Sequence, residues 1–174
     1  MKFIPLTLIL IILAGCYSPP NISEIKANFI TEKNSFEILN SLIKEDSVGG
    51  QCFAVGHEHI GEFWKTSDDL WHKSGEYSLR VSLEKVLKET GIPGARYSRY
   101  MALFEKTGVQ RVSHCLEIGW SRFTIKASGL GVSGCLTSIN INDNLNIPKS
   151  DVTESYSNDV TPIVDGWYIS HDCT

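Results

Sequence analysis

Hydrophobic residues follow a helical period over the first long segment after residue 20. Positions spaced by three, four and seven share one helix face, and this spacing predicts a helix over residues 22–43. The residues on that face are Ile22, Ile25, Phe29, Phe36, Leu39 and Ile43. Asn21 or Ser23 can cap its start, and Val48-Gly49-Gly50 ends it. The short apolar run that follows, residues 51–56, predicts a strand.

Two more helices and a group of strands are predicted further along the chain. Ser82 caps a short helix that ends at Gly91, and Pro93 opens another that ends at Gly108. From residue 109 onward hydrophobic and polar residues alternate, which is typical of half-buried strands. The predicted strands are residues 111–118, 121–127, 132–140 and 167–171.

Residues 57–78 are polar and are predicted to be a long, partly irregular excursion, and residues 142–162 are predicted to be a surface loop. Helices therefore come first and strands afterwards. This order predicts an α+β domain in which N-terminal helices are followed by an antiparallel sheet, rather than a parallel βαβ fold. Residues 21–174 are long enough to form a single domain with its own hydrophobic core.

The beginning of the chain has a different pattern, an apolar run over residues 3–13 preceded by Lys2. This run has the length of the apolar part of a signal peptide and is too short to span a bilayer, which takes roughly 20 residues. It ends in Leu13-Ala14-Gly15-Cys16, which resembles the lipobox of bacterial lipoproteins. The alternative is an ordinary secretory signal followed by a chance cysteine.

The resemblance implies that residues 1–15 are a cleaved lipoprotein signal peptide, that Cys16 carries the lipid, and that residues 16–20 tether the domain. Several acyl chains, each stabilised by about 0.8 kcal/mol per buried methylene, make a durable membrane anchor. In Gram-negative lipoproteins an aspartate after the cysteine tends to hold the protein at the inner membrane. Tyr17 takes that place here, so the resemblance favours the outer membrane, with the domain facing the periplasm.

The cysteines that remain are Cys52, Cys115, Cys135 and Cys173, an even number that predicts two disulfides in an exported protein. Three pairings are possible. If residues 111–118, 121–127 and 132–140 form a meander, Cys115 and Cys135 lie two strand spacings apart, about 9.6 Å. A disulfide needs Cα atoms within about 7 Å. The meander therefore disfavours pairing Cys115 with Cys135. If the last strand lies beside residues 132–140, Cys135 can pair with Cys173, which leaves Cys52 with Cys115.

The composition limits the classes of binding partner that we expect, and the sequence gives no reason to assign a metal or cofactor. The formal net charge of −4 argues against nucleic acid and against a polybasic membrane patch. The most site-like cluster is His57-Glu58-His59, because two histidines on one face of a strand can bind one metal. A third ligand would come from Glu62, Asp68, Asp69 or His72. The alternative is a solvated polar segment.

Other motifs have structural explanations. Residues 129–134 match G-x-G-x-x-G, but a strand rather than a helix is predicted after them, so we expect a glycine-rich hairpin. His114 and Cys115 would point to opposite faces of a strand, which favours a disulfide for the cysteine over a Cys–His pair. Arg96, Arg99 and Tyr100 are a candidate carboxylate or phosphate site, with a solvated basic face as the alternative. Core positions are expected for Trp64, Trp71 and Trp167, with anchors of a binding interface as the alternative.

Four motifs together look like a diffuse pattern in small uncharacterised bacterial envelope proteins. They are Lys44-Glu45-Asp46, Arg96-Tyr97, Gly129-Leu130-Gly131-Val132-Ser133-Gly134 and Gly166-Trp167-Tyr168. This resemblance implies no activity and no site.

The expected function is binding at the envelope rather than catalysis, because the sequence contains no complete catalytic constellation. We expect a lipid-anchored protein that is either an inhibitor or immunity-like protein or an accessory subunit of an envelope assembly. Residues 57–78 and 142–162 would supply the surface that contacts an envelope protein partner. The alternative is a metal-binding or hydrolytic envelope protein that uses His57-Glu58-His59.

Overall fold

The computed structural model describes residues 20–47, 52–130, 133–145, 147–152 and 156–174. The predicted signal peptide, the predicted lipidation site at Cys16 and all of the predicted tether except its last residue lie outside these ranges. Within them, no helix is both long enough and apolar enough to cross a bilayer.

The main element of the fold is one eleven-stranded sheet in which all described neighbours run antiparallel. Its strand order is β5-β4-β3-β2-β1-β6-β7-β8-β11-β10-β9. The strands are β1 (Cys52–Gly56), β2 (His59–Ile60), β3 (Phe63–Lys65), β4 (Trp71–Lys73), β5 (Glu76–Val81), β6 (Arg111–Cys115), β7 (Trp120–Leu130), β8 (Ser133–Asn142), β9 (Asp151–Val152), β10 (Ser157–Val164) and β11 (Trp167–Cys173).

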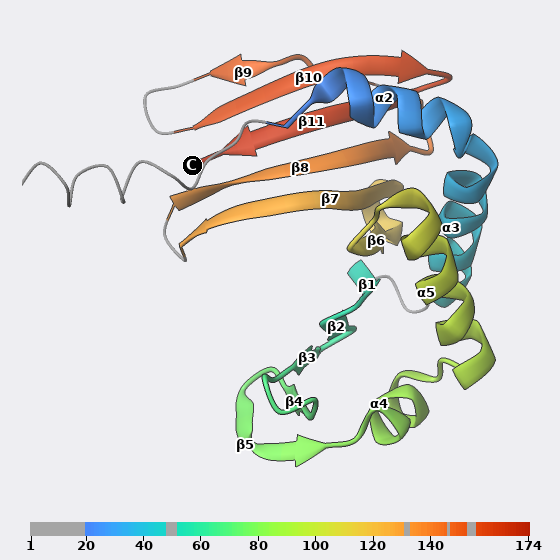
Figure 1. Ribbon diagram of the computed structural model, residues 1–174, viewed down its shortest axis with the longest axis vertical. Coiled ribbons are helices and arrows are strands. Elements are labelled where there is room, and N and C mark those ends of the chain that lie inside the picture. Colours follow the sequence, from blue (N-terminus) through green and yellow to red (C-terminus); the bar gives the residue numbers. More distant parts are fainter. Residues whose placement is uncertain (1–19, 48–51, 131–132, 146, 153–155) are drawn as a thin grey trace, which may run out of the picture.

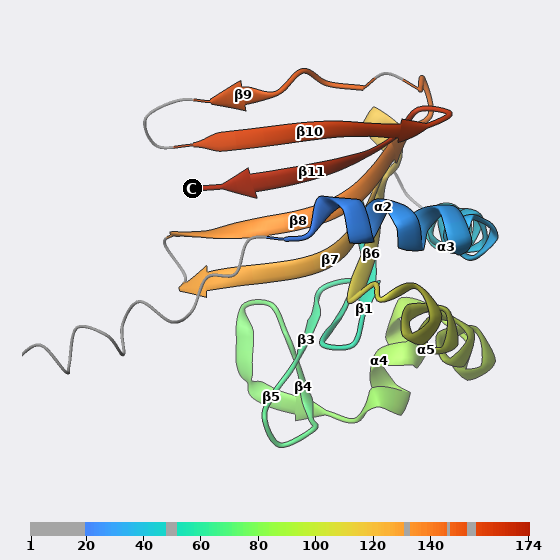
Figure 2. The same cartoon turned by 45° about the horizontal axis from the view of Figure 1, so that its top comes forward.

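Four described α-helices accompany the sheet: α2 (Ile22–Thr31), α3 (Lys33–Asp46), α4 (Leu83–Thr90) and α5 (Gly94–Thr107). The strands bend into an arc, and the helices lie along its outer side (Figure 1). The second view shows the same arrangement, with α2 and α3 over the long strands and α4 and α5 beside the short ones (Figure 2). The inner side of the arc is therefore a sheet face without helices.

The predicted helix over residues 22–43 is two helices, because the chain leaves helical geometry at Glu32. The Glu32 carboxylate accepts a hydrogen bond from Ser35 at 2.9 Å and pairs with Lys106 of α5 at 2.9 Å. The break lets Phe29 and Phe36 meet with ring centroids 5.1 Å apart. Both helices thus contribute aromatic rings to one core.

That core lies between the helices and the sheet. Val55, Val112, Phe123, Ile139 and Ile169 occupy facing positions on five neighbouring strands and are all buried. Trp167 completes the cluster by packing against Phe29, Phe36 and Phe123. Because side chains alternate along a strand, the residues between these positions point to the helix-free face.

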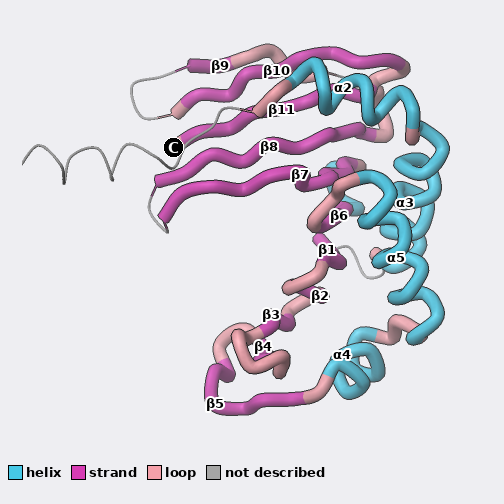
Figure 3. Tube along the Cα trace, in the orientation of Figure 1, coloured by secondary structure: helices cyan, strands magenta, loops and turns pink. Residues whose placement is uncertain are grey.

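The mixed α+β class is confirmed, but the prediction that all helices precede the sheet is wrong. Strands β1–β5 come before α4 and α5. The polar segment 57–78, predicted to be partly irregular, contains the short strands β2–β4 and the first half of β5, which alternate with turns in the lower arm of the arc (Figure 3). The predicted loop 142–162 likewise contains β9 and most of β10. Strands of two or three residues are too short to show an alternating pattern, which explains the first of these errors.

The predicted disulfides are confirmed. Cys52 pairs with Cys115 across β1 and β6, and Cys135 pairs with Cys173 across β8 and β11. Each pair occupies directly facing positions on neighbouring antiparallel strands. The meander of β6, β7 and β8 that the pairing argument assumed is also present.

Candidate functional site

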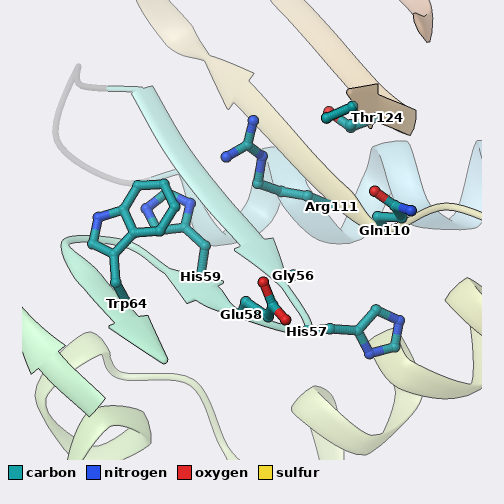
Figure 4. A pocket seen from close by; sticks show the side chains of 9 residues that line it. Gly56, His57, Glu58, His59, Trp64, Gln110, Arg111 and Thr124 are labelled. Atoms are coloured by element: carbon teal, nitrogen blue, oxygen red, sulfur yellow. The ribbon is translucent and has the colours of Figure 1, made fainter. Parts of the chain in front are cut away.

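A pocket of about 410 Å³ opens on the helix-free face, where the long strands meet the short ones. Its walls come from β1–β3 and the turn between β1 and β2 on one side, and from β6 and β7 on the other (Figure 4). The lining residues are Gly56, His57, Glu58, His59, Trp64, Gln110, Arg111, Thr124 and Ala127.

Arg111 supplies the positive charge of this pocket. It is the first residue of β6 and faces Gly56 of β1 on one side and Thr124 of β7 on the other. The side chain is half-buried, and burial lowers the pKa of its guanidinium. In the described part of the chain the guanidinium has no hydrogen bond and no acidic side chain within 4.0 Å. Among the described residues, Arg111 is therefore a partly desolvated cation without a counter-charge, an arrangement that costs free energy.

Gly56 makes room for this arginine. A Cβ atom at position 56 would lie 2.9 Å from the Gln110 carbonyl oxygen and 3.0 Å from the Arg111 Cβ. Both contacts are too close for any other residue, so glycine at this position lets β1 lie against the base of the Arg111 side chain.

His59 and Trp64 form the opposite wall. They face each other on β2 and β3, and their rings stack with centroids 4.0 Å apart and planes 22° apart. Burial, and then the nearby charge of Arg111, lower the pKa of His59 to about 4, so the imidazole is neutral at physiological pH. Its buried Nδ1 has no hydrogen-bond partner in the described structure. The Trp64 side of the stack is open, since Trp64 is 41% exposed.

His57 does not converge with His59. Residues 57 and 58 form the turn between β1 and β2, and His57 points away from the other pocket side chains (Figure 4). Its ring lies 5.5 Å from the Phe104 ring of α5. In the described ranges, the only group of three potential metal ligands within 4.8 Å of one another is Cys135, His171 and Cys173, and its cysteines form a disulfide.

A buried network of polar side chains lies next to the pocket on the same face. The only sign of it in the sequence is the alternation of polar and apolar residues along the strands. Asn140 donates to Ser170 at 3.0 Å, and the Ser138 and Ser170 hydroxyls lie 3.1 Å apart. Ser170 donates onward to Asp172 at 3.3 Å, and Asp172 lies 3.8 Å from Arg122. The Arg122 guanidinium also stacks 4.3 Å above the Trp120 ring. The second arginine of this face thus has partners within the protein.

The candidate anion site at Arg96, Arg99 and Tyr100 is mostly occupied by the protein's own acids. Arg96 donates to Asp46 at 2.9 Å and to Glu45 at 2.8 Å, and the Tyr100 hydroxyl donates to Asp46 at 2.7 Å. These contacts join the end of α3 to the start of α5. Tyr100 is fully buried, whereas Arg99 is exposed.

The remaining sequence candidates have structural roles. Residues 131 and 132 of the G-x-G-x-x-G motif lie outside the described ranges. Its described residues belong to β7 and β8, which pair antiparallel with Gly129 facing Gly134, as expected for a hairpin. His114 is buried and lies 2.9 Å from the Ser121 hydroxyl, while Cys115 is in a disulfide. The expected core positions hold for Trp71 and Trp167 but are wrong for Trp64, because it lies on the helix-free face.

Comparison of the chain with protein-family models, with curated proteins and with solved structures finds no match in any of the three.

Proposed function

We propose that this protein is a lipid-anchored, non-catalytic binding module of a bacterial cell envelope, and that its binding face is the helix-free inner face of the sheet. The observation that carries the proposal is the unpaired guanidinium of Arg111 in a pocket that also exposes the Trp64 ring. A partner that brings a negative charge to Arg111 offsets the cost of leaving that cation partly desolvated and alone.

The scaffold around the pocket suits recognition. Arg111 and Thr124 sit on strands held in register by neighbours on both sides. The Cys52–Cys115 disulfide joins the two strands that carry Gly56 and Arg111. Side chains on such strands lose little freedom when a partner binds, which favours affinity. The partner we propose is another envelope protein, for which this module acts as an inhibitor, an immunity-like protein or an accessory subunit.

The anchor is proposed from Leu13-Ala14-Gly15-Cys16 and is tested by intact mass spectrometry of the protein extracted from membranes. The expected mass begins at Cys16, includes acyl chains, and increases by two hydrogens for each disulfide on reduction. A mature chain without acyl groups would reject the anchor and leave the binding face to be tested separately.

The binding face is tested by site-specific photo-crosslinking in intact envelopes. A photoreactive residue at Glu58, an exposed position on the pocket wall, should give a discrete crosslinked product with one envelope protein. The matched control places the same residue at Arg99, exposed on α5. Arg111→Gln in the Glu58 variant should abolish the product. Equal products from both positions, or a product that survives Arg111→Gln, would contradict the proposal.

A further inference from the structure

The pocket specifies the chemistry of its ligand more closely than the proposed function does. We infer that it binds a carboxylate, with the Arg111 guanidinium holding the carboxylate oxygens and the Trp64 ring contacting an apolar or aromatic group of the same ligand. This inference rests on the proposed function, because it assigns the group that the binding face recognises.

The charged surroundings of Arg111 differ from those of the other arginines. Arg80 pairs with Asp68, Arg96 pairs with Glu45 and Asp46, and Arg122 lies near Asp172. Arg99 is exposed, so water solvates its charge. Arg111 alone among these five is half-buried without an acidic partner in the described residues. Its planar fork of N–H donors matches the two oxygens of a carboxylate.

The charged residues of the pocket suit a ligand with one negative charge better than a phosphate dianion. Arg111 is the only lysine or arginine among the lining residues, and Glu58 adds a negative charge at the rim. His59 contributes no positive charge near neutral pH, because its imidazole is uncharged there. A dianion would therefore remain only half neutralised, whereas a carboxylate is matched by one guanidinium.

The stacked rings position the rest of the ligand. His59 covers one side of the Trp64 ring, on the side where β1 and β6 lie, and 41% of the Trp64 surface remains exposed. Figure 4 shows the Arg111 guanidinium directed to the side of the pocket where these two rings lie. A ligand whose carboxylate meets Arg111 can extend across His59 and place a ring or alkyl group against Trp64, where burial of apolar surface adds affinity.

Calorimetry on the full-length, detergent-extracted protein tests this inference with 3-phenylpropanoate as the probe and 3-phenylpropanamide as its uncharged match. The acid should bind at least about tenfold more tightly than the amide, because only the acid pairs with Arg111. Arg111→Gln should weaken acid binding by at least about tenfold, whereas Arg99→Gln should leave it unchanged. Trp64→Ala should weaken 3-phenylpropanoate more than acetate, which has no ring. Circular dichroism and the melting temperature check that each variant is folded.

Several outcomes would overturn the inference: no binding of the acid, equal binding of acid and amide, no effect of Arg111→Gln, or tighter binding of inorganic phosphate. A free acid and the chain end of a peptide share this chemistry, and N-acetyl-Gly-Gly-Phe with a free carboxyl end separates them. Tighter binding of the peptide than of 3-phenylpropanoate identifies a chain end, and equal binding identifies a free acid. If crosslinking from Glu58 succeeds while the acid fails to bind, the binding face stands and the carboxylate assignment is rejected.

Discussion

Arg111 and His59 take their chemistry from the sheet face on which they lie. Arg111 occupies a polar position in a strand where polar and apolar residues alternate. In the sequence it therefore cannot be distinguished from a solvated surface arginine. On the inner side of a bent sheet the same position becomes half-buried. The sequence singled out His57-Glu58-His59 and thereby located the pocket. It did not reveal that His59 stacks on Trp64 or that His57 points elsewhere, because both depend on the turn at residues 57 and 58.

The depressed pKa of His59 predicts how stability depends on pH. Its pKa is about 4 in the folded protein, against an ordinary value of 6.5. Between these values the unfolded chain binds a proton that the folded chain does not, so the free energy of unfolding falls as the pH drops through this window. Above 6.5 this contribution is fully present.

Urea denaturation across the acid range measures this effect. His59→Gln should flatten the pH profile between pH 4 and 6.5 relative to the unmodified protein. Arg111→Gln should raise the pKa of His59, because it removes one of the two causes of the shift, and NMR titration of the imidazole reads this directly. A steep profile that persists in His59→Gln would show that other groups dominate.

At the scale of elements, long periodic segments were predicted well and short ones were missed. The apolar residues along one face of α5, and the alternating polar and apolar residues of β7, extend far enough for the buried face to be recognised. Strands β2, β3 and β4 have two or three residues each, and their buried side is recognised only because Ile60, Phe63 and Trp71 join the common core. The break at Glu32 was also missed, because hydrophobic spacing continues across it while the side-chain contacts that turn the chain come from α5.

The turn between β10 and β11 gives a prediction at this scale. Asp165 and Gly166 both have positive φ, 50° and 80°, as in the tight turns favoured by β-hairpins. A Cβ at Gly166 would lie 2.8 Å from the Leu145 Cβ and 2.9 Å from its Cα. Gly166→Ala therefore combines backbone strain with a steric clash and should lower the free energy of unfolding by about 2 to 4 kcal/mol.

Gly75 provides the matched control. It has a similar φ of 84°, but a Cβ there meets no atom within 4 Å. Gly75→Ala should cost only the backbone strain, about 1 kcal/mol. Thermal or urea denaturation of both variants measures the difference. Equal losses would mean that the contact with Leu145 yields without cost.

At the scale of the whole molecule, the disulfides link strands that are distant in the sequence. Cys52 and Cys115 are 63 residues apart and join the short-strand arm to the long strands, while Cys135 and Cys173 are 38 residues apart. Their pairing could be predicted from the meander together with the assumption that the last strand lies beside residues 132–140, and β11 does pair with β8. The curvature of the sheet was not predictable, since it arises from twist and from packing of the helices on one face only.

Removing the first disulfide tests its contribution to the fold. Replacing both Cys52 and Cys115 with Ser should lower the free energy of unfolding by about 2 to 4 kcal/mol, because the unfolded chain regains the freedom of a long loop. Acid binding at Arg111 should weaken as well, since the bond joins the two strands that flank the pocket. Unchanged stability together with unchanged binding would contradict this role.

Hydrogen–deuterium exchange of the full-length protein, with and without saturating 3-phenylpropanoate, is the most direct test of the claim that the helix-free face binds ligands. We expect slower exchange of the amides in residues 56–65, which form the turn and the short strands at the pocket, and no change in α2 and α3 on the opposite side of the sheet. Slower exchange confined to the helices, or no change at residues 56–65, would contradict it.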